Sequence, residues 1–574
     1  MSIGLILAIF SILVQVGLVV LVVLAVRHFG SRTGPRGTDA GTVRRFFQYL
    51  LLYGLMVVAA VGLSDLVGLL FQEPALAGDN RDTLARALTF SVFGIPMFAV
   101  MALWSRRRLR QDEDEVRSLG WAFYATVAPL TALAVDMFAL HDVVSAVLAG
   151  QRFDWSALSR FVVWSAVWLV HWIAAKRMLD DDRRQGQLVI GSLIGLATSV
   201  TGVVWLLGAS VDAILDQANT VLVQQNQLAS AAAVVVVGAP VWVVYWLRTL
   251  SGGRRTSLWF GYVLPVGVGG SLVLAVVGAS LALYQLLVWF VGEPASTQAA
   301  QHFKGTPTAG ACVVVGAVSW WYHRQVLARA TLGRTEVTRV YEYLMAGIAL
   351  LAAAVGLTMV VVTLVESLVP APAVEVGTSV VNSLLSGVTL LLVGGPLWWV
   401  FWSRIGRATR EYGPEELGSP TRRTYLFVLF GLGGVVAVVA VLVAAFGGIQ
   451  GALQGGFDAQ VVREMRVPVA ILLATGAISG YHWVVYRDDR SRLPVTSPQH
   501  GPHYVLLVGA PDGIVGDAVE RLTGARVDLW VRADGLAGPW AVDDVVAAVN
   551  QSGADAVAVV AGPAGLETIG MQRR

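Results

Sequence analysis

Long apolar stretches recur along most of this 574-residue chain, and they limit its possible folds more than any other feature. A helix that crosses a lipid bilayer needs about 20 mostly apolar residues. Backbone N–H and C=O groups must all be hydrogen-bonded inside lipid, so such stretches fold as helices. The sequence predicts thirteen spans, at residues 3–26, 46–71, 84–104, 119–149, 156–175, 187–213, 227–247, 258–291, 307–323, 340–368, 378–402, 424–453 and 465–486.

The composition agrees with a membrane protein. Charged residues make up 14% of the chain, whereas a soluble protein has about a quarter. The formal net charge of +3 gives no basic surplus for a nucleic-acid partner, so we expect none. The one cysteine, Cys312, excludes an internal disulfide and a cysteine-based metal site.

Lysine and arginine are distributed unevenly between the predicted connections. Of the 41 Lys and Arg residues, 29 lie in one alternating set of connections and 7 in the opposite set. Connections rich in these residues stay in the cytoplasm. The sequence therefore predicts a multi-pass protein of a bacterial plasma membrane, with its N-terminus outside and its C-terminus in the cytoplasm.

Two motifs recur with nearly the same period. A Gly-x-Pro motif contains Pro96, Pro240 and Pro396. A Trp- and His-rich helix end contains His171, His323 and His482. Two independent markers that both return roughly every 150 residues predict a unit of four helices used three times. Four helices return the chain to the side it left, so the units are parallel repeats that form either a ring or an open arc.

The beginnings of the first and third units also resemble each other. Residues 45–50 read Arg-Phe-Phe-Gln-Tyr-Leu and residues 339–344 read Arg-Val-Tyr-Glu-Tyr-Leu, an opening that the middle unit lacks. The predicted domains are an N-terminal helix with its connector (1–41), three four-helix repeats (42–184, 185–334 and 335–493), a linker (494–502) and a C-terminal domain (503–574).

The C-terminal domain has a different pattern. Val- and Leu-rich runs at 503–509, 525–531 and 554–561 alternate with helical patterns at 516–522 and 542–550. Such alternation predicts a small α/β domain with parallel strands. The Gly-rich turn at 509–516 lacks the spacing and the lysine of a phosphate-binding loop, so we interpret it as a plain connection.

The triple use of an Arg-aromatic opening, a Gly-x-Pro second helix and a Trp/His/Arg helix end resembles the bacterial membrane family known as domain of unknown function 5671. The resemblance covers about residues 42 to 490. The family has no assigned activity, so the resemblance implies a membrane fold and supplies no catalytic residues.

Three sets of residues are candidate sites. Pro96, Pro240 and Pro396 are expected helix kinks, either fixed for packing or acting as hinges. His171, His323 and His482 lie at one predicted depth, either in an interfacial aromatic belt or converging on a metal. Asp65, Asp212 and Glu366 lie toward the outer ends of the first helices, either as surface acids or as ion or proton sites.

No nucleophile–base pair, metal-spaced cluster or paired carboxylates stand out, so we expect no catalytic residues, and the sequence identifies no cofactor. The favoured function is a non-enzymatic scaffold or assembly protein with partners bound through its cytoplasmic tail. The alternatives are a transporter or channel with a path between the repeats and, from the histidines, a metal- or haem-binding redox protein.

Overall fold

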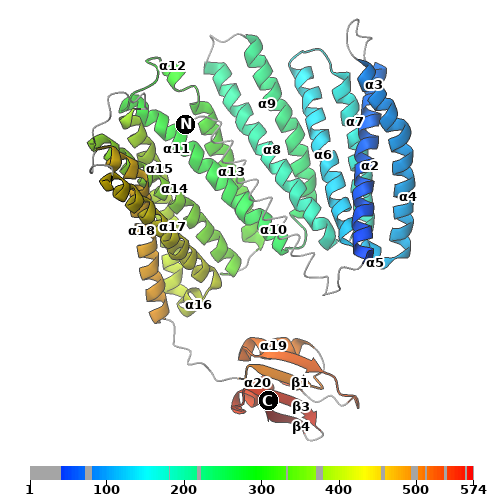
Figure 1. Cartoon of the computed structure of the whole chain (residues 1–574), viewed down its shortest axis with the longest axis vertical. Helices are drawn as coiled ribbons and strands as arrows, with labels where there is room; N and C mark the ends of the chain where they lie inside the picture. The colour runs from blue at the N-terminus through cyan, green and yellow to red at the C-terminus, as the bar shows by residue number, and fades with distance from the viewer. Residues whose placement is uncertain are drawn as a thin grey trace. The chain divides into compact units, whose positions relative to one another are not determined.

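The computed structural model describes residues 40–71, 80–179, 181–215, 221–330, 334–369, 379–453, 459–492, 502–510, 513–535, 540–562 and 565–572. The chain forms two compact units, Met1–Asp488 and Asp489–Arg574, whose elements are labelled in Figure 1. The predicted span at 3–26, and with it nearly all of the predicted domain 1–41, lies outside the described residues.

The helices of the first unit fall into three groups of four in chain order. Group 1 consists of α2 (Ala40–Phe71), a second helix that runs through α3 (Asn80–Thr89), the π-helix η1 (Phe90–Gly94) and α4 (Ile95–Gln111), the short α5 (Glu113–Val116), α6 (Leu119–Leu148) and α7 (Trp155–Met178).

Groups 2 and 3 follow the same order. Group 2 consists of α8 (Asp181–Leu215), α9 (Val221–Trp242) with the π-helix η2 (Val243–Leu250), a third helix built from α10 (Ser257–Tyr262), the π-helix η3 (Val263–Gly270) and α11 (Ser271–Phe290), then α12 (Ala299–His302) and α13 (Thr306–Ala330). Group 3 consists of α14 (Glu336–Leu368), α15 (Val380–Tyr412), α16 (Pro414–Leu417), α17 (Pro420–Leu453) and α18 (Ala459–Arg492).

Eleven helical segments in the described part of the chain are long and apolar enough to cross a membrane. They coincide with eleven of the predicted spans. The predicted span at 307–323 lies within α13, a helix of 25 residues that is not among these eleven. The helices of the first unit are therefore those of a membrane protein.

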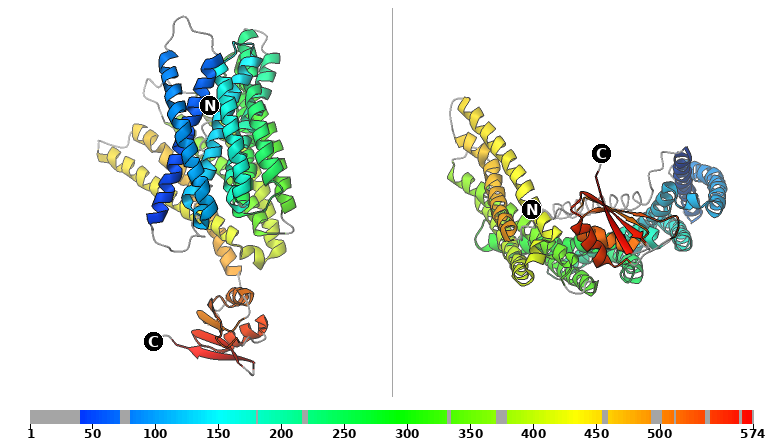
Figure 2. Two further views of the ribbon diagram at one scale, coloured as in Figure 1. Left: turned by 90° about the vertical axis from the view of Figure 1, so that its right-hand side faces the viewer. Right: turned by 90° about the horizontal axis from the view of Figure 1, so that it is seen from below.

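Successive groups pack through pairs of elements that recur. The third helix of one group contacts the second helix of the next, α6 with α9 and α11 with α15. The helices follow one another from α4 at one end of the unit to α17 and α18 at the other, and Figures 1 and 2 show that this row does not close on itself. Of the two arrangements that the repeats allowed, the first unit adopts the open one.

The first and second helices of every group cross at a pair of glycines. Gly62, Gly202 and Gly356 lie on the first helices, and Gly94, Gly238 and Gly394, the glycines of the Gly-x-Pro motif, lie on the second. An added Cβ would lie 2.6, 2.7 and 2.7 Å from the partner helix at the first three, and 2.9, 2.6 and 2.7 Å at the others. Small residues let membrane helices approach this closely.

The register of this crossing is the same in all three groups. Each glycine of the second helix meets the residues three and four positions before the glycine of the first helix, for example Ala59 and Val58 opposite Gly94. The reverse contact has the same offset, with Ser91 and Phe90 opposite Gly62. One packing arrangement is therefore built three times.

The second unit is a four-stranded α/β domain. Its elements are β1 (Tyr504–Val508), α19 (Gly513–Thr523), β2 (Arg526–Trp530), α20 (Val542–Gln551), β3 (Ala556–Gly562) and β4 (Gly565–Met571). The strand order is β2-β1-β3-β4, with β1 parallel to β2 and β3, and β4 antiparallel to β3. The sequence predicted the three parallel strands and both helices, but it missed β4.

The glycine crossing makes a prediction about stability. Gly394→Ala should destabilise the membrane unit by about 1–3 kcal/mol, because the new methyl group overpacks the contact with α14. Gly395→Ala is the matched control, since an added Cβ there meets nothing within 4 Å. The measurement is the thermal unfolding midpoint of both variants in detergent, and equal midpoints would contradict the crossing.

Candidate functional site

The third helix of each group begins with the same hydrogen bond. The side-chain hydroxyl oxygens of Ser118, Thr256 and Ser419 accept from the backbone N–H three residues later. This N-cap satisfies one of the free donors at a helix start. A tyrosine follows six residues after each cap, at Tyr124, Tyr262 and Tyr425, so the three helices align residue by residue.

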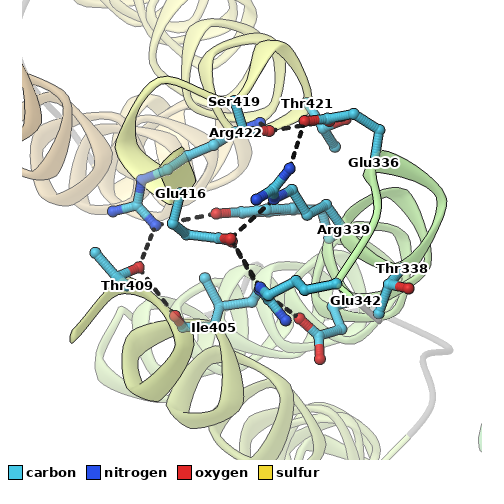
Figure 3. Close-up of polar contacts among 12 residues, drawn as sticks. Glu336, Thr338, Arg339, Glu342, Ile405, Thr409, Glu416, Ser419, Thr421 and Arg422 are labelled. Carbon is cyan, nitrogen blue, oxygen red and sulfur yellow. Dashed lines mark hydrogen bonds and ion pairs between the residues drawn. The ribbon is translucent and has the colours of Figure 1, made fainter. Parts of the chain in front are cut away.

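In group 3 a buried carboxylate lies three residues before the cap. Glu416 on α16 is fully buried, and its Oε1 accepts from Arg334 Nη2 at 2.7 Å. Its Oε2 accepts from Arg334 Nε and from Arg339 Nε, both at 2.8 Å. Figure 3 shows this carboxylate facing the guanidinium group of Arg339. The start of α14 is thereby fixed to the connection between α15 and α17.

Further polar contacts surround Glu416 and its two arginines in group 3 (Figure 3). Glu336 accepts from Arg339 Nη1 at 2.7 Å, from Ser419 Oγ at 3.0 Å and from Thr421 Oγ1 at 2.6 Å. Arg422 Nη1 donates to the Tyr343 hydroxyl at 3.0 Å and to Thr409 Oγ1 at 3.1 Å. The cluster joins α14, α15, the short α16 and α17, and we refer to it and to its counterpart in group 1 as the Arg–Glu clasps.

The clasp of group 1 has the same core. Glu115 lies three residues before Ser118 and is fully buried, and its Oε2 accepts from Arg45 Nε at 3.1 Å and from Arg44 Nη2 at 3.3 Å. Arg45 Nη2 also bonds Asp112 at 3.1 Å. Arg45 precedes Gly62 by the same sequence interval as Arg339 precedes Gly356, so the two clasps occupy equivalent places relative to the glycine crossing.

Group 2 has a neutral version of this contact. Gln185 precedes Gly202 by the interval that separates arginine from the crossing glycine in the other groups, and Gly253 replaces the buried glutamate. The Gln185 Oε1 accepts from Thr256 Oγ1 at 2.5 Å, and its Nε2 donates to the Arg254 carbonyl at 3.0 Å. The junction is therefore retained without a buried glutamate, and the neighbouring Arg184, which is buried, packs over the Trp172 ring.

The electrostatics of Glu416 follow from this geometry. Burial alone would raise the pKa of Glu416, but the hydrogen bonds and charges of Arg334 and Arg339 outweigh burial and lower it below its ordinary value. A buried carboxylate that is ionised and held by two arginines does not exchange a proton near neutral pH. The clasp is suited to fixing helices rather than to acid–base catalysis.

The predicted site histidines lie apart, each within its own group. His171, His323 and His482 all bond through Nδ1 to the carbonyl four residues earlier in their own helix. Each ring packs against the aligned tyrosine of the third helix, and in group 1 the Tyr124 hydroxyl bonds His171 Nε2 at 2.8 Å. Within the described ranges, no group of three His, Cys, Asp or Glu residues is arranged to hold a metal ion.

Two of the three predicted acidic residues are paired with arginine. Asp65 accepts from Arg86 Nε at 2.8 Å, and Glu366 accepts from Arg466 Nε at 2.7 Å. Asp212 and Glu366 lie ten residues after the crossing glycine of their helix, but Asp65 lies only three after Gly62. At 1.5 Å per residue the difference is about 10 Å, so Asp65 does not share the place of the other two.

The prolines lie two residues beyond the crossing glycines but in different local structure. Pro96 is the second residue of α4, directly after η1. Pro240 is inside α9, just before η2, and Pro396 is inside the continuous helix α15. The feature shared by the three Gly-x-Pro motifs is the close contact of their glycine with the first helix of the same group.

Sequence reasoning missed the buried glutamates. The signal was the Glu-x-x-Ser pattern of residues 115–118 and 416–419. This pattern does not predict burial, because both glutamates lie among other charged residues in connections with the composition of solvent-exposed segments. Burial in a connection is a tertiary property, and the local sequence does not reveal it.

The C-terminal domain has a second candidate site, on one face of its sheet. Val505 and Leu507 are fully buried in a core that also contains side chains of α19 and α20. Leu506 and Val508 point to the opposite face and are only half-buried. We call this second surface the open sheet face.

Apolar residues in register with β1 extend the open sheet face. Val508 lies beside Trp530 and Val560, and Leu506 lies beside Ala558, which is paired with Ile569. Trp530 is 62% exposed and Ile569 is 51% exposed. The predicted Gly-rich turn begins at Gly509, whose φ is +88° and whose carbonyl accepts from Trp540 Nε1 at 2.9 Å, while residues 511–512 lie outside the description.

The clasp of group 3 makes a prediction about stability. Glu416→Gln should cost about 3–5 kcal/mol, because breaking a buried ion pair leaves uncompensated charge. Glu415→Gln is the matched control, since Glu415 is exposed on the same short helix. Chemical or thermal unfolding of the two variants is the measurement, and similar losses in both would refute the role of Glu416.

The lowered pKa of Glu416 also predicts a pH dependence. The carboxylate stabilises the fold above its ordinary pKa of 4.5, and this contribution is lost as the pH falls through the lower value of the folded state. The unfolding midpoint of the unmodified protein should therefore drop more steeply below pH 4.5 than that of Glu416→Gln. Parallel pH profiles for the two proteins would count against this assignment.

Comparison with known proteins identifies the repeated unit. Neither a curated protein nor a solved structure matches the chain significantly. The family model described as domain of unknown function (DUF5671) matches residues 45–155, 187–318 and 339–477. Each match contains the glycine crossing and the capped third helix of one group. The chain therefore belongs to the DUF5671 family, with three copies of its domain.

Proposed function

We propose that this protein is a non-enzymatic scaffold of a bacterial plasma membrane. In this proposal the three DUF5671 copies form a rigid anchor, and the C-terminal α/β domain binds a protein partner in the cytoplasm. The observation that carries the proposal is the open sheet face, with Trp530 62% exposed. A large apolar surface on a domain in water marks an interaction site.

The membrane unit supports the scaffold role by how its charges are used. The buried glutamates of both clasps, together with Asp65 and Glu366, are held by arginines. Charges held in this way fix helices to one another. The transport alternative uses Asp65, Asp212 and Glu366 as ion or proton sites. It is less well supported because Asp65 and Glu366 are each neutralised by an arginine.

The redox alternative loses its main support. It required His171, His323 and His482 to converge, or two of them to face a common group. Each lies instead against a tyrosine of its own group. Their common hydrogen bond to a carbonyl in the same helix is a local feature that needs no bound metal.

The chemistry of the open sheet face indicates the kind of partner. The face is apolar along its central strands, and Arg526 and Glu567 lie on its edge strands β2 and β4. Helices α19 and α20 already cover the opposite side of the sheet, and a sheet with two apolar faces is normally covered on both. We therefore expect an amphipathic helix of a partner protein, with an apolar stripe flanked by both signs of charge.

Trp530→Ala should remove specific partners from the full-length protein, because the largest apolar side chain of the face is lost. Leu522→Ala is the matched control, since Leu522 is 58% exposed on α19, in the helical layer. The measurement is quantitative co-purification after cross-linking in membranes, with thermal unfolding to verify folding. Identical partner sets for both variants and the unmodified chain would reject the open sheet face as the binding site.

A further inference from the structure

One carboxyl group lies in the middle of a membrane span. Asp136 is close to the midpoint of the span Gly120–Leu148 in α6. Its hydrogen-bond partner Ser165 is close to the midpoint of the span Trp155–Met178 in α7. The hydrocarbon core of a bilayer is about 30 Å thick, so the pair lies far from both surfaces.

The environment of Asp136 differs from that of Asp65, Asp142 and Glu366, three other acidic residues in the described spans. Its Oδ1 accepts a hydrogen bond from Ser165 Oγ at 2.5 Å. Asp65, Asp142 and Glu366 each have an arginine within 4 Å. Over the described residues, no Lys, Arg or His forms an ion pair with Asp136.

The position of Asp136 determines which protonation state is stable. A charged aspartate at the centre of a membrane helix costs about 2.5–3.5 kcal/mol on insertion scales. One hydroxyl donor supplies a hydrogen bond but no opposite charge. The neutral acid avoids this cost, and it can still accept the hydrogen bond from Ser165 through its carbonyl oxygen.

The repeats provide an internal comparison. When the third helices are aligned on Tyr124, Tyr262 and Tyr425, the place of Asp136 is taken by Leu274 and Ala437. When the fourth helices are aligned on their histidines, the place of Ser165 is taken by Ala317 and Gly476. Two copies of the domain therefore build the same helices with apolar residues here, so the pair is not required by the fold.

The other titratable groups near Asp136 lie at a distance along the helix axes. On α2, Tyr53 is bonded to Thr131 of α6 at 3.1 Å. On α7, Arg160 and His171 are five and six residues from Ser165, or about 7–9 Å along the axis.

The charged residues of α6, α8 and α9 also lie away from Asp136. On α6 itself, His141 and Asp142 contact each other at 3.4 Å toward the outer end. Helix α8 has its charged residues near its ends, including Arg184 and Asp212, and α9 contains no titratable residue. On α2, Arg44 and Arg45 are bonded to Glu115 of α5, and Asp65 is bonded to Arg86. Among the described residues, none of the charged groups on the helices packed against α6 forms an ion pair with Asp136.

We propose that Asp136 is a proton-binding site inside the membrane, in which the carboxyl group is protonated at neutral pH and is positioned by Ser165. It releases the proton only when water or a base reaches the α6–α7 contact. The site belongs to group 1 alone, which gives the three otherwise similar copies different chemistry. This inference does not depend on the proposed scaffold function, because it concerns the membrane unit and not the C-terminal domain.

Infrared spectroscopy of the full-length protein in lipid tests the protonation state. At neutral pH the carbonyl band of a protonated carboxylic acid should be present in the unmodified protein and absent in Asp136→Asn. Asp142→Asn is the control, since Asp142 is an outer-end carboxylate beside Arg160, and the band should persist in it. A spectrum that is unchanged by Asp136→Asn, or a band lost in the control, would overturn the proposal.

A chemical probe gives an independent readout. Dicyclohexylcarbodiimide enters lipid and reacts with protonated carboxyl groups: the carboxyl O–H adds across one C=N bond, and the acyl group then migrates to nitrogen. No leaving group departs, so the product is a stable N-acylurea with the mass of the whole reagent added. Mass spectrometry should place one adduct on Asp136, formed faster at lower pH and missing in Asp136→Asn. No adduct on Asp136 would contradict the assignment.

A stability measurement separates proton binding from a packing role. Asp136→Leu reproduces the residue that group 2 has at this place, Leu274. If the carboxyl group is a proton site, this variant should unfold at the same or a higher temperature, since a polar group has been removed from lipid depth. A clearly lower midpoint would show that the Asp136–Ser165 pair holds the helices together, and the proposal would fail.

Discussion

The close approach of two helices at a pair of glycines is the interaction on which the membrane unit depends. Lipid tails are as apolar as the side chains, so membrane helices associate through close packing rather than through the hydrophobic effect. Each group meets this requirement with glycines that face the partner backbone, such as Gly238 on α9 opposite Ser199 and Thr198 on α8. Because the offset is the same in every group, the crossing also sets the register in which the remaining helices align.

The helix ends show that one geometry can be held by different chemistry. Groups 1 and 3 join the first helix to the connection before the third through buried glutamates, Glu115 and Glu416. Group 2 makes the same junction with Gln185 and Thr256. Removing one partner of a buried ion pair is costly, whereas replacing the whole pair by neutral groups need not be. This explains how the middle copy can have Gly253 and Gln185 in place of the glutamate and its arginine and still keep the fold.

The sequence allowed eleven of the thirteen predicted spans, the repeat period and most of the C-terminal domain to be predicted correctly, because these depend on local patterns. Runs of apolar residues mark spans, and the recurrence of Pro96, Pro240 and Pro396 with three histidines marked the four-helix unit, in agreement with the three family matches. Strand β4 was missed because Gly565–Met571 contains two glycines, a glutamate and a threonine, and is a strand only through its pairing with β3.

The candidate sites were less predictable, because they depend on contacts between distant residues. Asp65 lies 31 residues before Pro96, close to the 28 and 30 residues that separate Asp212 and Glu366 from Pro240 and Pro396. Because the connections between first and second helices differ in length, these similar intervals do not show that Asp65 lies seven residues earlier in its helix than the other two. The burial of Glu416 and the partnership of Asp136 with Ser165 across α6 and α7 are tertiary facts. In contrast, the Gly-x-Pro motif is visible in the sequence, but the sequence alone does not show that its glycine makes the shared helix contact.

A cryo-electron-microscopy map of the purified full-length protein would test the central claim most directly. If one crossing is built three times, superposing the three groups on their first helices will bring Gly94, Gly238 and Gly394 to one place, each facing the residues three and four positions before the glycine of its partner helix. A map in which any group crosses at other residues, or with a shifted register, would contradict the account.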